Sequence, residues 1–170
     1  MGRVKVIETN LVFLPNHEGL RKKTNLIIVH HVGETDKDVS AAEIHRWHLQ
    51  RGFTGIGYHY VIRKNGSIER GRPREWVGSH CNAGFDNFNS IGICVVGDFM
   101  RFKPGQKQID SLVNLIADLC NIYSLNSGPT TIFGHRDRKK TSCPGDNLYM
   151  MIPDIRNKAA YLISTKGKAV

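Results

Sequence analysis

A histidine and a cysteine share the short segment 134–145, whose sequence is GHRDRKKTSCPG. The segment is too rich in glycine, proline and charge to form one regular helix, so His135 and Cys143 sit on a loop that can fold back on itself. An imidazole and a thiol brought together in this way are a natural pair of zinc ligands. Two ligands do not make a zinc site, and the chain must supply a third from another segment.

The apolar run at residues 26–29, LIIV, is typical of a buried strand, and it ends at His30 and His31. If the strand that leads to His135 lies beside it, His30 and His135 can share one metal with Cys143. Two histidines and one cysteine leave the fourth tetrahedral position to water, which is the catalytic form of a zinc site. Such a metal lowers the pKa of its water to about 7 and polarises a carbonyl, and amide hydrolysis needs both effects.

Amide hydrolysis also needs a group that handles the proton or holds the developing oxyanion. Tyr58 begins a predicted strand and can point at the site, and Thr141 lies two residues before Cys143. A histidine at the end of a strand or a tyrosine in a sheet is more often a packing residue. From the residues alone, these side chains could therefore either pack in the core or form the site of a zinc hydrolase.

These groups need a scaffold, and the hydrophobic pattern predicts alternating strands and helices. Residues 40–43 form a capping box, which begins a helix that runs to about Arg51. Asn65-Gly66 is a strong signal for a tight hairpin turn, and residues 77–89 form a long loop. We expect strands at 26–30, 55–62, 68–71, 91–96 and 130–133, a short strand near 11–14, a long helix at 104–123, and a helical tail that Pro153 interrupts.

The predicted fold is a single α/β domain with a mixed central β-sheet and helices on both faces. The 170 residues, 40% hydrophobic and 23% charged, suit one globular domain with a sizeable core. We expect this domain to span residues 1–170, with its core at 24–150, an N-terminal extension at 1–23 and a flexible basic tail at 165–170. We expect Cys94 and Cys120 to be buried. We expect His45 and His48 to lie at the helix surface or boundary.

The chain carries a net charge of +9, which predicts an anionic partner. Nucleic acid, an anionic wall polymer and an anionic membrane all qualify, although the sequence has no RNA-binding, zinc-finger or basic-zipper spacing. No apolar run approaches the length of a membrane span, and the N-terminal residues lack the apolar stretch of a secretory signal. The four scattered cysteines indicate a reducing compartment and no disulfide scaffold.

Several blocks in order resemble one known family. They are LIIVHH, the capped helix with RWH, GIGYHYVIRKNGSIERGR, VGSHCNAGFDNFNSIGICVVGDF and GHRDRKKTSCPG. Together they resemble the zinc-dependent N-acetylmuramoyl-L-alanine amidases, which include short phage amidase-type lysozymes and the animal peptidoglycan recognition proteins. The resemblance covers roughly residues 24–150, and the combination of blocks is highly specific, although each block alone would be weak.

This resemblance implies an endolysin-type hydrolase that cleaves the amide between muramic acid and the L-alanine of the stem peptide in bacterial peptidoglycan. It implies one zinc ion, held by His30 rather than His31, by His135 and by Cys143. It also implies a catalytic Tyr58, and it places Thr141 where some short phage enzymes have a lysine and amidase-active recognition proteins have threonine. Three residues are expected in the substrate groove: His80, Asn82 and Asn89.

Two other classes of function stay open. A recognition domain without catalysis would keep the groove and lose a ligand, typically the cysteine. A nucleic-acid or polymerase-binding regulator would use the basic surface, although the family motifs do not locate one and nucleic acid is not an expected partner. For the amidase, we expect a monomer without a transmembrane segment that accumulates in the cytoplasm of the producing cell and reaches the wall after release.

Overall fold

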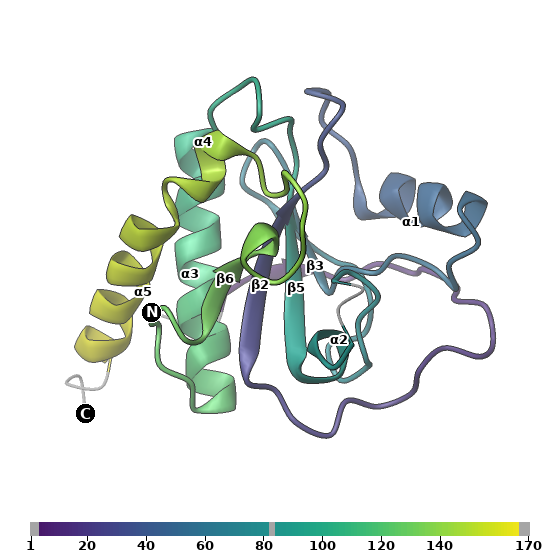
Figure 1. The fold of residues 1–170 in the computed structure, drawn as a ribbon, viewed down its shortest axis with the longest axis horizontal. Coiled ribbons are helices and arrows are strands. Elements are labelled where there is room, and N and C mark those ends of the chain that lie inside the picture. The colour runs from purple at the N-terminus through teal and green to yellow at the C-terminus, as the bar shows by residue number, and fades with distance from the viewer. Residues whose placement is uncertain (1–3, 82–83, 167–170) are drawn as a thin grey trace.

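The computed structural model describes residues 4–81 and 84–166, and within them one six-stranded sheet lies between helices (Figure 1). The strands are β1 (Val6–Ile7), β2 (Leu26–His31), β3 (Tyr60–Ile62), β4 (Ile68–Arg70), β5 (Ser90–Val95) and β6 (Ile132–Gly134). The helices are α1 (Ala41–Gln50), α2 (Asp86–Asn89), α3 (Gln106–Tyr123), the 3-10 turn η1 (His135–Asp137), α4 (Asp146–Tyr149) and α5 (Ile152–Lys166).

The strand order is β1-β4-β3-β5-β2-β6, and it confirms the predicted mixed sheet. Strands β3 and β4 form the antiparallel hairpin that Asn65-Gly66 predicts, and every other neighbouring pair is parallel. The apolar strand β2 lies between β5 and β6, so its backbone is hydrogen-bonded on both sides. Both faces of this strand are also covered, so side chains that point either way are buried, which explains its nearly continuous run of apolar residues.

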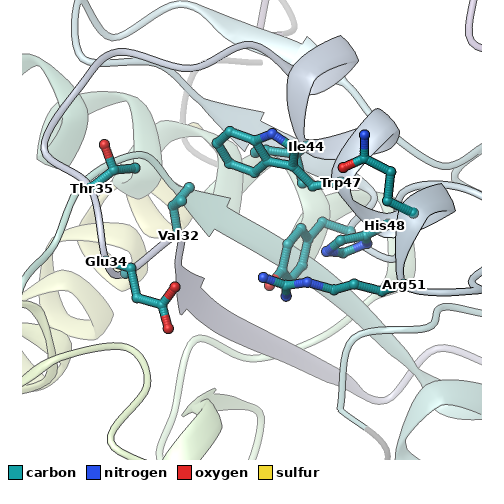
Figure 2. Close-up of a pocket in the computed structure, with 10 residues that line it drawn as sticks. Val32, Glu34, Thr35, Ile44, Trp47, His48 and Arg51 are labelled. Carbon is teal, nitrogen blue, oxygen red and sulfur yellow. The ribbon is translucent and has the colours of Figure 1, made fainter.

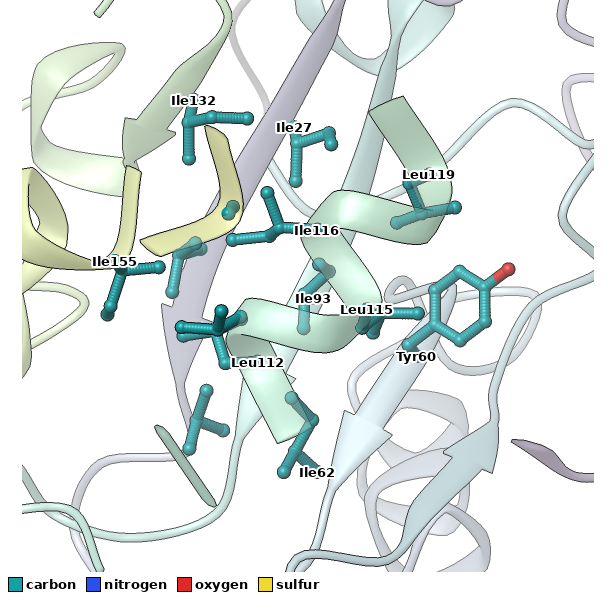
Figure 3. Packing of buried hydrophobic residues seen from close by; sticks show 14 of the residues in the cluster. Ile27, Tyr60, Ile62, Ile93, Leu112, Leu115, Ile116, Leu119, Ile132 and Ile155 are labelled. Atoms are coloured by element: carbon teal, nitrogen blue, oxygen red, sulfur yellow. The ribbon is translucent and has the colours of Figure 1, made fainter. Parts of the chain in front are cut away.

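Helices cover both faces of the sheet, as the sequence predicts (Figure 1). Helices α3 and α5 pack against one face, where Ile27, Val29 and Ile93 meet the apolar side of α3 (Figure 3). Alternate residues of the same strands point to the opposite face, where Val61 and Cys94 pack with Ile44 of α1. The larger core therefore lies under α3 and α5, and the α1 face carries the smaller core. Cys94 and Cys120 are both buried, as predicted.

The local signals around α1 are confirmed. The Ser40 hydroxyl accepts from the backbone N–H of Glu43, and the Glu43 carboxylate accepts from the backbone N–H of Ser40 at 2.7 Å. This reciprocal capping satisfies backbone donors that would otherwise be unpaired at the first turn. Gly52 follows the helix with a φ of +82°, a left-handed conformation that favours glycine.

The prediction that His45 and His48 lie at the helix surface or boundary is wrong, because both side chains are buried. Nδ1 of His45 accepts from the backbone N–H of Ile56 at 3.2 Å, and Nδ1 of His48 accepts from Gly57 at 3.0 Å. An imidazole can enter a core when its nitrogen atoms have such partners. The two histidines thus hold the segment before β3 against α1.

Other predicted boundaries differ from the structure. Residues 11–14 form no strand, and the extension instead contributes β1, which pairs with β4. Only Tyr60–Ile62 of the expected strand at 55–62 joins the sheet, because the preceding residues bend around two glycines to meet α1. Pro153 lies in the first turn of α5 and does not interrupt it, since a proline there lacks only an N–H that has no helical partner.

In the tail, Thr165 and Lys166 still belong to α5, and residues 167–170 of the expected flexible basic tail lie outside the described residues. The division into a core at 24–150 and two extensions stays a prediction. Across residues 4–81 and 84–166, no helix combines the length and apolar character needed to cross a membrane.

The burial of His48 predicts a pH-dependent stability. Burial lowers its pKa to about 4, whereas an unfolded histidine titrates near 6.5. As the pH falls below 6.5, the unfolded chain binds a proton that the folded chain does not, so the free energy of unfolding decreases between about pH 6.5 and pH 4. The slope from this residue is up to about 1.4 kcal/mol per pH unit. Urea denaturation at several pH values across this window measures it.

The matched variant is His48→Asn, whose amide oxygen can still accept from Gly57 and which does not ionise. We expect a shallower pH slope in this variant than in the wild type, because other buried histidines keep their own contributions. Identical slopes would contradict the assignment of this effect to His48.

Candidate metal centre

Strand pairing brings the two predicted histidine ligands together. In the parallel pair β2 and β6, Val29 lies opposite Gly134, so His30 and His135 occupy the next position on each strand. Their ring centroids are 4.4 Å apart. His30 is fully buried and points to the α1 face, because Val29 before it points into the core beneath α3. The pairing on which the sequence prediction depended is therefore present.

Cys143 returns to the same point on the loop after η1. Its Sγ is 3.7 Å from Nδ1 of His30 and accepts from the backbone N–H of His31 at 3.4 Å. One potential ligand atom from each of His30, His135 and Cys143 lies within 4.8 Å of the others. A tetrahedral ion needs this kind of spacing, and the donor set of two imidazoles and one thiol suits zinc.

Hydrogen bonds within the segment, together with Gly134 and Gly145, hold the loop in this position. The Asp137 carboxylate accepts from the backbone N–H of Gly134 at 2.8 Å and from the Tyr149 hydroxyl at 2.6 Å, which fixes the turn after His135. A Cβ on Gly145 would lie 2.5 Å from the backbone of Phe99, so the chain after Cys143 passes too close for any side chain. The segment 134–145, whose composition rules out a regular helix, therefore forms a well-defined loop that brings Cys143 back to His30.

Burial keeps the three candidate ligands uncharged when no cation is bound. Desolvation lowers the pKa of His30 well below its usual value and lowers that of His135 as well, so both imidazoles are neutral with a lone pair to donate. Burial raises the pKa of the Cys143 thiol to about 12. A thiolate there requires a neighbouring positive charge, and a bound divalent cation supplies one. The residues therefore fit a metal ion both in spacing and in charge.

Tyr58 lies beside His30, and Thr141 is bonded to the backbone of Cys143. The Tyr58 ring is 5.1 Å from the ring of His30, and burial raises its pKa well above the usual value, so the phenol keeps its proton. Thr141 Oγ1 accepts from the backbone N–H of Cys143 at 3.2 Å. The Thr141 hydroxyl hydrogen is then left for donation to another group. Both side chains can therefore act as neutral hydrogen-bond donors beside the three candidate ligands.

A pocket of about 380 Å³ opens beside Tyr58, between α1 and the loop after β2 (Figure 2). The pocket is lined by the aromatic side chains of Trp47, His48 and Tyr58 and by charged side chains of both signs, Glu34 and Arg51. Figure 2 shows Trp47 and His48 of α1 and Arg51, which follows the helix, on one side and Glu34 and Thr35 on the other. Trp47, His48 and Arg51 were not among the predicted site residues, although the RWH block that contains the first two contributed to the family resemblance.

The three expected groove residues have different positions. The His80 side chain is buried behind His30, with its Nδ1 3.0 Å from Nε2 of His30. Asn82 lies outside the described residues. Asn89 is at the other end of the strands, where its backbone carbonyl accepts from Asn25 at 2.8 Å. The structure thus places His80 next to a candidate ligand and Asn89 away from it, and the substrate-binding roles stay predictions.

The fold and this group of residues place the chain among the amidase and peptidoglycan recognition folds. The solved structure of the endolysin amidase LysCS from Clostridium intestinale superposes with a TM-score of 0.82 and 34% identity, covering 92% of this chain and 97% of that one. Drosophila PGRP-LB superposes with a TM-score of 0.75 and 26% identity, covering 87% of this chain and 92% of that one. The endolysin of Klebsiella phage KP32 is 33% identical over 136 residues, which are 75% of this chain and 85% of that protein.

Residues 20–146 match the sequence profile described as N-acetylmuramoyl-L-alanine amidase. The chain belongs to the N-acetylmuramoyl-L-alanine amidase family. It is a peptidoglycan-hydrolysing amidase, as the order of its sequence blocks predicts.

A Cys143→Ser variant tests the metal centre directly. Serine has nearly the same shape, but its hydroxyl has a far higher pKa and is a poor zinc ligand. We expect the purified variant to hold little or no zinc by elemental analysis, and a chelator to remove zinc from the wild type. The variant should remain folded with reduced stability, because the larger core lies on the other face of the sheet. Full zinc content in a folded variant would show that the centre lies elsewhere.

Proposed function

We propose that the chain binds one zinc ion through His30, His135 and Cys143, and that this centre cleaves the bond between N-acetylmuramic acid and L-alanine. The observation that carries the proposal is the convergence of these three side chains, from strand β2 and from the segment 134–145, beside Tyr58 and a pocket. When bound in an open tetrahedral site, zinc acidifies water and polarises a carbonyl oxygen. Every other part of the reaction falls to the side chains of this protein.

Tyr58 and Thr141 are proposed to stabilise the negative charge that develops on the carbonyl oxygen. A protonated phenol at the wall of the pocket can donate to this oxygen, and donors in a water-poor site are effective because they need no reorganisation. Thr141 is fixed by its bond to the backbone of Cys143, and its remaining hydrogen can orient water or the substrate. Neither side chain carries a charge, so both act by hydrogen bonding.

The substrate is proposed to enter along the pocket between α1 and the loop after β2. A stem peptide carries amides and carboxylates, and the pocket offers Arg51 together with the indole of Trp47 to receive such groups (Figure 2). Substrate binding by His80, Asn82 and Asn89 is retained as a proposal, and the buried His80 would act on the substrate only through His30. The chain is proposed to act as a monomer.

The protein is proposed to be made in the cytoplasm of a host cell and to reach peptidoglycan after release. This proposal is supported by the phage endolysin to which the chain is similar. The net charge of the chain, +9, would favour contact with an anionic wall.

Digestion of purified peptidoglycan followed by mass analysis tests the proposed bond. We expect free stem peptides that begin with L-alanine, together with glycan strands that have lost them. Wild-type protein treated with chelator and the Cys143→Ser variant are the matched negative controls. Fragments cut within the glycan or within the peptide would contradict the proposal, and binding without cleavage would favour a recognition domain.

Tyr58→Phe isolates the role of one hydroxyl. The variant keeps the ring that packs beside His30, so the fold and the zinc content should be unchanged. If the hydroxyl stabilises the transition state, the rate of peptidoglycan cleavage should fall roughly 10²-fold or more, with the larger effect on kcat. Near-normal activity in a zinc-loaded variant would make Tyr58 a packing residue.

The salt dependence of lysis tests the role of the basic surface. Salt screens the attraction between charged surfaces that are farther apart than the Debye length. The Debye length is about 8 Å in physiological salt and shortens as salt is added, so charge steering weakens. We expect the lytic rate on intact walls to fall as salt rises, while cleavage of a small uncharged fragment changes little. Equal salt dependence for both substrates would contradict steering.

A further inference from the structure

His80 connects a candidate zinc ligand to the interior of the protein. Its Nδ1 is 3.0 Å from Nε2 of His30, and its Nε2 is 3.3 Å from Oγ of Ser90. The Ser90 hydroxyl also bonds to the backbone carbonyl of Asp86. His30 and Ser90 are fully buried and His80 is 8% exposed, so the chain of bonds is shielded from solvent.

The last acceptor determines the direction of every bond in this chain. A backbone carbonyl only accepts, so the single hydroxyl hydrogen of Ser90 goes to Asp86. Oγ of Ser90 must then accept the hydrogen that Nε2 of His80 carries. Burial beside the imidazoles of His30 and His59 disfavours a charged ring, so Nδ1 of His80 has no hydrogen and accepts. His30 therefore carries its hydrogen on Nε2, and its Nδ1 keeps a lone pair.

That lone pair lies on the side of Cys143. Nδ1 of His30 is 3.7 Å from Sγ of Cys143, within the group of three candidate ligands. A neutral histidine can bind a metal through either nitrogen, and the bond made by the other nitrogen decides which one is available. The bonds through His80 and Ser90 leave only Nδ1 of His30 for the metal.

The surroundings of His80 fix the plane of its ring. A Cβ on Gly78 or on Gly92 would lie 2.5 Å from the imidazole, so these two glycines leave the space that the ring fills. The Asn87 side-chain oxygen accepts from the backbone N–H of His80 at 3.1 Å and of Cys81 at 2.9 Å. The ring is therefore closely surrounded at Gly78 and Gly92, and its backbone is held by Asn87.

We propose that His80 is a positioning residue of the metal centre, which accepts the Nε2 hydrogen of His30, is itself oriented by Ser90, and thereby presents Nδ1 of His30 to zinc. The inference rests on the proposed zinc site and gives His80 a different role from contact with the substrate. It also assigns a role to Ser90, which lies in one of the family-like blocks but is not among the predicted site residues.

The hydrogen positions are measured on the metal-free wild type by nitrogen-15 NMR of its histidine rings. We expect His80 and His30 each to carry a hydrogen on Nε2 and none on Nδ1. A hydrogen on Nδ1 of His80 would overturn the proposal. This measurement needs no variant, so it remains decisive if substitutions in the core disturb folding.

Zinc affinity, measured by competition with a chelator, tests the consequence. His80→Leu removes the acceptor, and we expect zinc to bind roughly 10- to 100-fold more weakly, the usual effect of losing a partner of a metal-bound histidine. His80→Asn keeps an oxygen near the position of Nδ1 and should recover much of the affinity. His45→Leu, the same change at a buried histidine of α1, should reduce stability without this loss of affinity.

The two proposals fail in different ways. A wild type that binds no zinc would contradict the zinc site itself. A wild type that binds zinc, together with a folded His80→Leu variant of equal affinity, would contradict only the positioning role of His80.

Discussion

The parallel pairing of β2 with both β5 and β6 is the constraint on which the rest of the structure depends. It places Val29 opposite Gly134, and the residues that follow them, His30 and His135, then meet at the end of the two strands. A shift of one residue in β2 would turn His30 into the core beneath α3, because side chains alternate between the faces of a sheet. The isoleucines and valine of β2, buried on both faces, make such a shift costly. The register of a hydrophobic strand therefore fixes the geometry of a polar site.

The two faces of the sheet have different roles: one carries the larger hydrophobic core, and the other carries the candidate site. The larger core, built from α3, α5 and the strand residues that point toward them, contains none of the candidate ligands or pocket residues (Figure 3). The opposite face carries the candidate ligands, Tyr58 and α1, and it buries several imidazoles; among residues 4–81 and 84–166, no carboxylate joins the candidate metal group. Such a cluster is tolerated because desolvation keeps the rings neutral. The proposed metal ion would therefore bind to a group of side chains that are uncharged before it arrives.

Sequence reasoning identified the parts of the fold and the site that local signals encode. The run before His30, the capping box at Ser40 and the turn at Asn65-Gly66 each determine structure within a few residues, and all three are confirmed. The environment of His45 and His48 depends on which distant backbone groups they bond, and residue type alone suggested exposure. His80 was recognised by its block, but its contact with His30 depends on how the loop at 77–89 packs over Gly92. The sequence also could not show that Asn89 lies at the far end of the strands.

Thr141 bears on how the site handles charge, because a family relative with lysine there would bring a cation that threonine cannot supply. The two nearby arginines, Arg136 and Arg138, do not take the place of this lysine, because both are paired with carboxylates. Arg138 is held by both carboxylate oxygens of Asp86 at 2.9 Å, and Arg136 pairs with Asp146 at 2.7 Å. In the proposed reaction, Tyr58 and Thr141 would meet the developing negative charge as neutral donors, and the proposed metal ion would supply positive charge that Thr141 does not. The proposed site would therefore depend more on its metal than one that has a lysine at position 141.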